Sequence, residues 1–153
     1  MRSKLNSELK LAIKSQNKVR LSTLRLINAA IKDRDIAIRT EETSEGVSDD
    51  AILEILTQMI KQRVDSINQY QEGGRLELAE RESSEISVIE EFLPKQLSET
   101  EINESIKLAI LDEKASSVRD MGKVISNLKA KYTGRINFSQ IAPLVKKILT
   151  KDN

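Results

Sequence analysis

Apolar residues recur every three or four positions along most of the chain, as they do on one face of an amphipathic helix. Leu5, Leu9 and Ile13 begin this pattern, and Ile52 and Leu56 open its longest run. No stretch alternates apolar and polar residues with the period of two that marks a strand. Only five glycines and two prolines interrupt the 153 residues, so long helices are expected. The sequence therefore predicts an all-α fold.

Helix start and stop signals divide this pattern into segments. The predicted helices cover about residues 5–13, 17–39, 48–72, 75–93, 98–110, 117–133 and 141–148, and the polar stretch 40–46 (TEETSEG) predicts a loop. Gly73-Gly74 predicts a turn with a left-handed cap, so the long helices on either side should form an antiparallel hairpin. Pro94–Ser98 marks the boundary between an N-terminal helical lobe, residues 1–94, and a small three-helix lobe, residues 95–153. Candidate N-cap residues are Asn17, Ser48, Ser98 and Ser117, and Ser98 forms a capping-box pattern with Glu101.

The absence of cysteine and histidine excludes several classes of site. Without cysteine there is no disulfide, thiolate nucleophile or zinc finger, and without histidine the commonest acid–base group and metal ligand are missing. No arrangement of Asp, Glu, Lys or Ser replaces them, so we predict no catalytic residue, no metal site and no cofactor. No apolar run approaches the ~18 residues needed to span a bilayer, and the N-terminus lacks a signal-peptide core. We therefore expect a cytoplasmic protein without a membrane partner.

The charged residues are distributed in three blocks, although the net charge is only +1. Residues 1–40 hold ten Lys/Arg and three Asp/Glu, for a net charge of +7. Residues 41–118 have a net charge of −12, and residues 119–153 a net charge of +6. Two basic ends around an acidic middle favour a surface for a polyanion, and solvated helix faces are the alternative explanation.

The acids of the middle block also raise the possibility of a carboxylate metal site. Six glutamates lie on the predicted helix after the glycine pair: Glu77, Glu80, Glu82, Glu85, Glu90 and Glu91. Di-iron helical bundles pair such acids with histidine, so solvated helix faces explain these residues better. Lys61-Gln62-Arg63 lies beside the apolar face of the preceding helix. Its basic side chains are expected either to form salt bridges to the acidic helix or to lay their aliphatic stems along the apolar face with their charged ends in water.

The segment from Asp120 to Arg135 differs from an ordinary amphipathic helix. Gly122 lies inside the helical pattern at a cost of roughly 1 kcal/mol relative to alanine, which suggests a close approach to the backbone or close helix packing. Lys129, Lys131 and Arg135 gather at the helix end, where they also suit the helix dipole. With the N-terminus of the last helix, this corner predicts a phosphate-binding surface. Aromatic residues are only 3%, and Tyr132 alone is placed to touch a ribose or base, so a folded RNA is the expected ligand.

These residues lie in stretches that resemble the GatB/YqeY family, specifically its freestanding YqeY-like members. The matching stretches are KVRLSTLRLINAAIKDRDI (18–36), IKQRVDSINQYQEGGRLELAERESSEISVIEEFLPKQLSETE (60–101) and MGKVISNLKAKYTGR (121–135). The resemblance implies two helical lobes and similarity to the C-terminal, tRNA-contacting region of the B subunit of a glutamine-dependent tRNA amidotransferase. It also carries the label of a carbon–nitrogen ligase with glutamine as amide donor. The characteristic positions of the tail domain are Gly122, Lys123, Lys131, Gly134 and Arg135.

One position departs from the family pattern. Family members usually follow Gly-Arg or Gly-Lys with alanine, whereas this chain has Ile136, which is expected to narrow the approach to the loop.

In the first basic block, Lys18, Arg20 and Arg25 are further candidate nucleic-acid contacts.

Three functions remain open on the sequence. The first is an accessory module that binds tRNA or a folded RNA of similar shape. The second is a noncatalytic adaptor whose acidic hairpin docks on a protein partner in aminoacyl-tRNA synthesis or on the ribosome. The third is a component of an amidotransferase.

Overall fold

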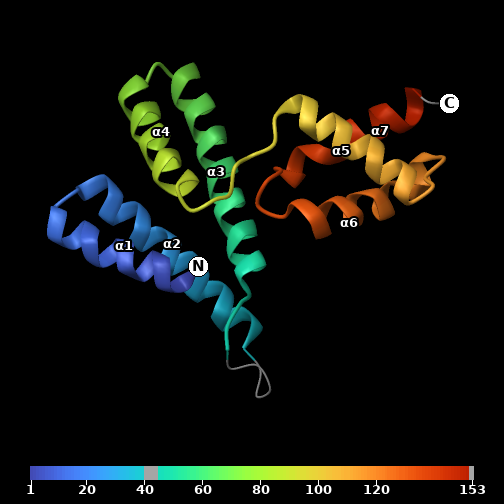
Figure 1. Ribbon diagram of the computed structural model, residues 1–153. Helices are drawn as coiled ribbons and strands as arrows, with labels where there is room; N and C mark the ends of the chain where they lie inside the picture. The colour runs from blue at the N-terminus through green and yellow to red at the C-terminus, as the bar shows by residue number, and fades with distance from the viewer. Residues whose placement is uncertain (40–44, 152–153) are drawn as a thin grey trace. The chain divides into compact units, whose positions relative to one another are not determined.

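The computed structural model of the chain describes residues 1–39 and 45–151, except for the side chain at position 139 (Figure 1). Every regular element in these residues is a helix, which confirms the predicted all-α fold. Residues 40–44 of the predicted loop lie outside the described residues. The chain divides into two compact units, residues 1–94 (unit 1) and residues 95–153 (unit 2). No helix in the described part of the chain has the length and apolarity that crossing a membrane requires.

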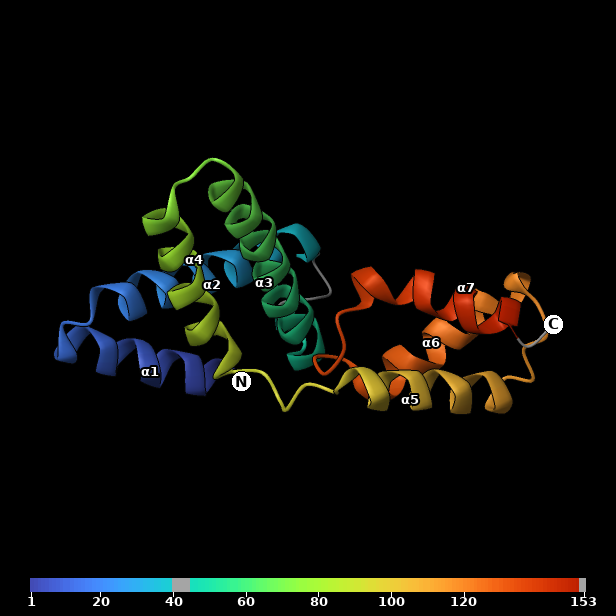
Figure 2. The same cartoon turned by 90° about the horizontal axis from the view of Figure 1, so that it is seen from above.

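The described residues of unit 1 form four helices, which are arranged as two hairpins. They are α1 (Arg2–Ser15), α2 (Lys18–Ile38), α3 (Asp49–Glu72) and α4 (Leu76–Glu90). The side chains of Asn17 and Ser48 accept hydrogen bonds from backbone N–H groups in the first turns of α2 and α3, as N-caps do. At the glycine pair the left-handed residue is Gly74, with φ of 70°, whereas Gly73 has φ of −82°. α3 and α4 lie side by side in both views of the chain (Figures 1 and 2).

One apolar core holds the two hairpins of unit 1 together. Leu5 of α1, Ile27 of α2, Leu56 of α3 and Ile89 of α4 are each at most 1% exposed. Phe92, just after α4, packs into the same core at 4% exposure. Every helix of unit 1 therefore depends on burial supplied by the others, since apolar area removed from water is the main stabilising contribution.

Unit 2 is built from three α-helices and two short 3-10 turns. The elements are α5 (Glu99–Asp112), η1 (Val118–Asp120), α6 (Met121–Tyr132), η2 (Phe138–Gln140) and α7 (Ile141–Lys151). The capping box of Ser98 and Glu101 is present at the start of α5. Ser117 and Asp120 form the same motif, but it opens the 3-10 turn η1 before α6 begins. Pro143 lies in the first turn of α7, where its missing N–H costs little.

The core of unit 2 is separate from that of unit 1. It is formed by Ile106 of α5, Val124 and Leu128 of α6, and Ile141 and Val145 of α7, each at most 2% exposed. These residues fix one face of each helix toward the centre of the unit. The opposite faces of α5, α6 and α7 are thereby available to solvent.

Candidate nucleic-acid interface

The outward face of α6 carries a broad hollow of about 720 Å³, which we call the α6 groove. Its lining residues come from the end of α5, from η1 and from α6: Glu113, Arg119, Gly122, Lys123, Ser126, Asn127, Ala130 and Lys131. Three of them are basic and one is acidic. The groove therefore combines small residues of α6 with basic side chains from α6 and η1.

Small residues form the floor of this groove. Gly122, Ser126 and Ala130 are spaced by four, so they follow one another along the helix. A Cβ atom added at Gly122 would meet no atom of the described residues within 4 Å. Packing by another helix of these residues therefore does not explain the glycine. Of the two interpretations drawn from the sequence, an open approach to the backbone agrees with the geometry.

The basic side chains of the groove differ in their partners. Among the described residues, no ion pair involves Arg119 or Lys123, and both are exposed. The ammonium of Lys131 lies 3.0 Å from Asp112, and both side chains are about half exposed. An exposed pair of this kind is worth roughly 0–1 kcal/mol, so a phosphate can compete for the lysine.

Asp120 also carries a negative charge near the groove. Its carboxylate accepts hydrogen bonds from the backbone N–H groups of Ser116 and Ser117 at 3.0 and 3.4 Å. These two bonds, Ser116 first, hold the pKa of Asp120 below its usual value. The acid serves to start the turn that leads into α6.

Asn127 is the polar side chain that the groove leaves incompletely satisfied. Its amide nitrogen donates to the carboxylate of Glu113 at 3.1 Å. Its Oδ1 atom is buried and accepts no hydrogen bond within the described part of the chain. Because buried polar atoms are nearly always paired, this oxygen is an exception, and its burial separates it from ligands at the surface of the groove.

The Gly134-Arg135 corner is occupied by contacts within unit 2. The Arg135 Nε donates to the carbonyl of Lys95 at 3.0 Å, and the backbone N–H of Leu97 donates to the carbonyl of Arg135 at 3.0 Å. The Gln96 amide donates to the carbonyl of Gly134 at 2.5 Å. Gly134 is buried and has φ of 81°. The corner thus fastens residues 95–97 to the end of α6.

Lys129 and Tyr132 lie beside this corner and contact aromatic or cationic neighbours. The Lys129 ammonium lies 5.9 Å from the centre of the Phe138 ring, and the Arg135 guanidinium lies 6.0 Å from that of Tyr132. The Tyr132 ring also packs against the core of unit 2. Neither Lys129 nor Tyr132 lines the α6 groove.

Ile136 does not narrow the approach to the loop as the sequence suggested. Its side chain is 2% exposed and belongs to the core of unit 2 with Ile106 and Leu128. A larger apolar residue at this position therefore fills the interior, and the surface of the loop is left unchanged.

The three candidate residues of the first basic block have different environments. Arg20 donates to Glu91 at 2.6 Å and to Glu8 at 2.8 Å, and these hydrogen bonds, Glu91 first, raise its pKa. Lys18 and Arg25 are exposed, and no ion pair of the described residues includes them. Arg20 is therefore a structural clamp between α2, α1 and the residue after α4.

Residues 1–40, the first basic block, belong to unit 1, which also contains most of the acidic residues of the chain. Residues 1–94 contain fourteen Lys/Arg and seventeen Asp/Glu, which gives unit 1 a net charge of −3. Residues 95–153 contain eleven Lys/Arg and seven Asp/Glu, which gives unit 2 a net charge of +4. Unit 2 is therefore the part of the chain that attracts a polyanion.

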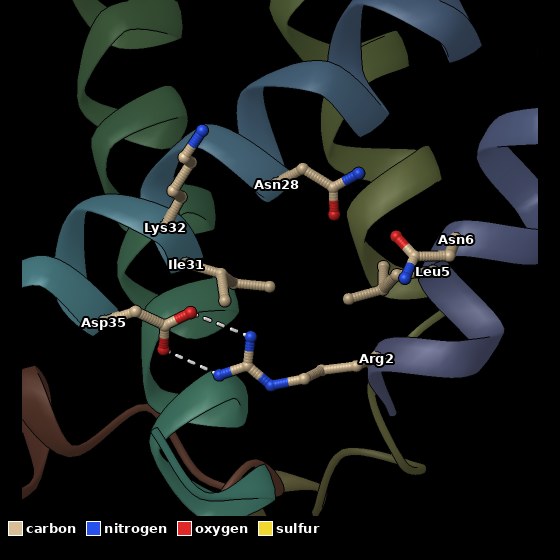
Figure 3. A pocket seen from close by; sticks show the side chains of 7 residues that line it. All are labelled: Arg2, Leu5, Asn6, Asn28, Ile31, Lys32 and Asp35. Atoms are coloured by element: carbon tan, nitrogen blue, oxygen red, sulfur yellow. Dashed lines mark hydrogen bonds and ion pairs between the residues drawn. The ribbon is translucent and has the colours of Figure 1, made fainter. Parts of the chain in front are cut away.

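A hollow of about 290 Å³ in unit 1 is closed on one side by an ion pair (Figure 3). Arg2 approaches the carboxylate of Asp35 with both terminal nitrogens, at 2.9 and 2.7 Å. Arg2 and then the backbone N–H of Val47 lower the pKa of Asp35 to about 2. These groups tie α1, α2 and the segment before α3 together, so the cation is already paired.

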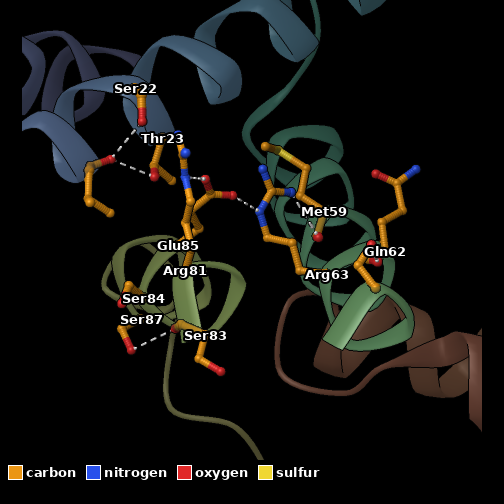
Figure 4. Close-up of polar contacts among 12 residues, drawn as sticks. Ser22, Thr23, Met59, Gln62, Arg63, Arg81, Ser83, Ser84, Glu85 and Ser87 are labelled. Carbon is orange, nitrogen blue, oxygen red and sulfur yellow. Dashed lines mark hydrogen bonds and ion pairs between the residues drawn. The ribbon is translucent and has the colours of Figure 1, made fainter. Parts of the chain in front are cut away.

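The acidic helix α4 contains one glutamate that is not solvated, contrary to the sequence interpretation. Glu85 is 7% exposed and lies 2.9 Å from Arg63 of α3 (Figure 4). Arg81 approaches the same carboxylate at 3.8 Å. The expected salt bridge between the basic segment of α3 and the acidic helix is confirmed. Within residues 1–39 and 45–151, no cluster of three or more carboxylates is arranged to hold a metal ion.

Arg119, Ser126 and Asn127 are groove residues that the sequence analysis missed. The spacing of Arg119 and Lys123 by four, beside Gly122, Ser126 and Ala130 at the same interval, was the available signal. It became informative only when the buried face of α6 was known.

Comparison with known proteins places the chain in a family. The sequence pattern of the family described as Yqey-like protein matches residues 2–149. The chain belongs to that family. It is 31% identical to altered inheritance of mitochondria protein 41, mitochondrial, of Pyrenophora tritici-repentis, over 84% of this chain and 71% of that protein. The protein of the same name from Lachancea thermotolerans is 29% identical, over 96% of this chain and 80% of its own length.

These relatives correct one expectation from the sequence. They are named as mitochondrial proteins, and so is the relative from Clavispora lusitaniae, which is 31% identical over 74% of this chain and 65% of its own length. The comparison therefore points to mitochondria, and the predicted cytoplasmic location is wrong.

Proposed function

We propose that the chain is an accessory module that binds tRNA, or a folded RNA of similar shape, through the α6 groove of unit 2. The observation that carries the proposal is the combination of an open backbone at Gly122 with basic side chains in the same groove. Phosphates would bind Arg119, Lys123 and Lys131, because charge-assisted hydrogen bonds to phosphate are strong.

The shape of the groove favours a folded RNA over a single strand. No aromatic side chain lines it, so stacking of unpaired bases contributes nothing there. The minor groove of an A-form helix is wide and shallow and presents 2′-hydroxyls and phosphates. A broad protein surface floored by Gly122, Ser126 and Ala130 can approach such a groove closely.

The other basic residues of unit 2 extend the proposed contact beyond the groove. Lys129 and Arg135 retain donors that are not used in their contacts with Phe138 and Lys95. With Arg119, Lys123 and Lys131 they could neutralise about five phosphates. The logarithm of the association constant should then fall with the logarithm of salt concentration with a slope of about −4 to −5.

The test is a fluorescence-anisotropy titration of labelled tRNA with the full chain at several salt concentrations. The double variant Arg119→Ala/Lys123→Ala is expected to weaken binding to all tRNA species and to reduce the salt slope by about 2. The matched control Lys146→Ala/Lys147→Ala removes the same charge from exposed positions of α7 that do not line the α6 groove.

The results separate a local contact from general charge attraction. Equal loss of affinity in the two double variants would mean that net charge alone drives binding. Unchanged affinity of Arg119→Ala/Lys123→Ala would end the proposal.

Following its relatives, we also propose a mitochondrial location, for which fractionation of the native cells is the test.

A further inference from the structure

A second hollow of unit 2, of about 330 Å³, lies between α5 and α7 on surfaces that the proposed RNA contact does not use. We call it the α5–α7 groove. Its lining residues are Asn103, Lys107, Leu144, Lys147, Ile148 and Lys151. Half of these side chains are lysines and none is acidic. The α5–α7 groove shares no lining residue with the α6 groove.

The three lysines surround apolar side chains that unit 2 leaves exposed. Leu144 is 37% exposed, although the next residue, Val145, and Ile141 one turn earlier are buried. Leu111 is 72% exposed and follows Lys107 by four residues on α5, so it continues the same row of the helix. No ion pair of the described residues includes Lys107, Lys147 or Lys151. An apolar strip with unpaired cations at its edges is therefore open to solvent.

We infer that the α5–α7 groove binds an acidic amphipathic helix of a partner protein. Exposed leucines beside the groove favour a protein ligand over RNA, because phosphates gain nothing from apolar contact. Three cations without acidic partners favour carboxylates on the flanks of the ligand. The inference does not depend on RNA binding by the α6 groove.

The length of the groove matches two turns of a docked helix. From Leu144 to Lys151 the groove follows α7 over seven helical steps, which is about 10 Å at the rise of 1.5 Å per residue. A helix that docks in a groove presents apolar anchors at i, i+3 or i+4, and i+7, over the same distance. Leucines at these positions would contact Leu144 and Ile148, and glutamates beside them would approach the three lysines.

The experiment uses a labelled synthetic peptide with leucines at i, i+4 and i+7 and glutamates on both flanks. Its binding to the full chain is measured by fluorescence anisotropy, with a scrambled peptide of the same composition whose leucines share no face. We expect the patterned peptide to bind at least about tenfold more tightly than the scrambled one, because only the patterned peptide can bury its leucines together in the groove.

Variants of α7 locate the binding site. Lys147→Glu/Lys151→Glu is expected to weaken binding of the patterned peptide by about tenfold, because two attractive pairs become repulsive. Leu144→Asp should weaken it similarly. The matched control Lys146→Glu changes the charge on the same helix at an exposed residue outside the groove, and a single reversal there should have little effect.

Three results would overturn the inference. The first is equal binding of the patterned and scrambled peptides. The second is loss of tRNA affinity, without loss of peptide affinity, in Lys147→Glu/Lys151→Glu, because the groove would then be an RNA contact. The third is a change of oligomeric state in that variant, because a second copy of the chain would then be the ligand. None of these results concerns the variants of Arg119 and Lys123, so the proposed function is tested separately.

Discussion

Replacing Gly122 should strengthen the fold of unit 2 while blocking its proposed ligand. Glycine in a helix costs roughly 0.5–1 kcal/mol relative to alanine, because the unfolded chain loses more conformational freedom. The Cβ position at Gly122 is open, so no steric penalty offsets this gain. Gly122→Ala is therefore expected to stabilise the unit by about 0.5–1 kcal/mol. For a unit of this size the melting temperature should rise by about 2–8 °C.

A larger side chain at the same position separates stability from binding. Leucine is nearly as good a helix former as alanine, so Gly122→Leu should retain most of the gain in stability. Its side chain would fill the floor of the α6 groove beside Ser126. We expect tRNA affinity to fall about tenfold, which corresponds to the loss of one or two hydrogen bonds, or 1.4 kcal/mol.

Calorimetry on the full chain measures the melting temperature, and amide exchange of α6 assigns the transition to unit 2. Anisotropy titration measures tRNA affinity. Thr100→Leu, which places a leucine at an exposed residue of α5 outside the α6 groove, is the control and should bind tRNA normally. A lower melting temperature for Gly122→Ala would refute the argument that its surroundings are open. Normal tRNA binding by Gly122→Leu would refute the assignment of the groove.

Three further predictions concern stability. Arg2 lowers the pKa of Asp35 to about 2, below its ordinary value of 3.8, so the stability that the ionised carboxylate contributes is fully present above about pH 4 and is lost as the pH falls toward 2. In an acid titration Asp35→Asn should therefore lose less stability over that range than the unmodified chain. Identical curves for the two proteins would contradict the reasoning. Removing Glu85 leaves Arg63, whose side chain is only 11% exposed, without that partner, so Glu85→Ala should cost about 2–4 kcal/mol in urea denaturation, and a joint replacement of both residues by apolar ones should recover most of it. Ser98→Ala removes the hydrogen bond at the start of α5 and should lower the stability of unit 2 by about 1 kcal/mol in the same assay, with no change in the urea dependence.

The helices could be predicted from the sequence because the capping residues and the apolar spacing that specify a helix lie within a few residues of one another. Ser98 and Glu101 specify a capping box within one turn, and the structure has it. The spacing of apolar residues correctly predicted that Leu5, Ile52 and Leu56 are buried, whereas Ile13, which belongs to the same pattern, is 52% exposed. The interruption at Ser117 was less predictable, because the capping motif there starts a 3-10 turn that continues directly into α6.

The candidate site could be predicted only in part, because it depends on contacts between residues that are far apart in the sequence. The sequence could not show that Arg20 meets Glu91 or that Arg135 meets the carbonyl of Lys95. It also could not show that Ile136 points into the core. Charge counts give the number of cations in a segment, but the number available to a ligand is decided by which acids and carbonyls the fold brings to them.

The clamp formed by Arg20 has a consequence for the order in which the chain folds during synthesis. Glu91, one of its two partners, follows Arg20 by 71 residues, and Phe92 completes the core that covers Leu5. At translation rates of about 5–20 residues per second, roughly 4–14 s pass between the emergence of the arginine and that of its partner. During this interval α1 and α2 lack the residues that bury them. The first hairpin to be made should therefore be among the last parts of unit 1 to gain protection from proteases.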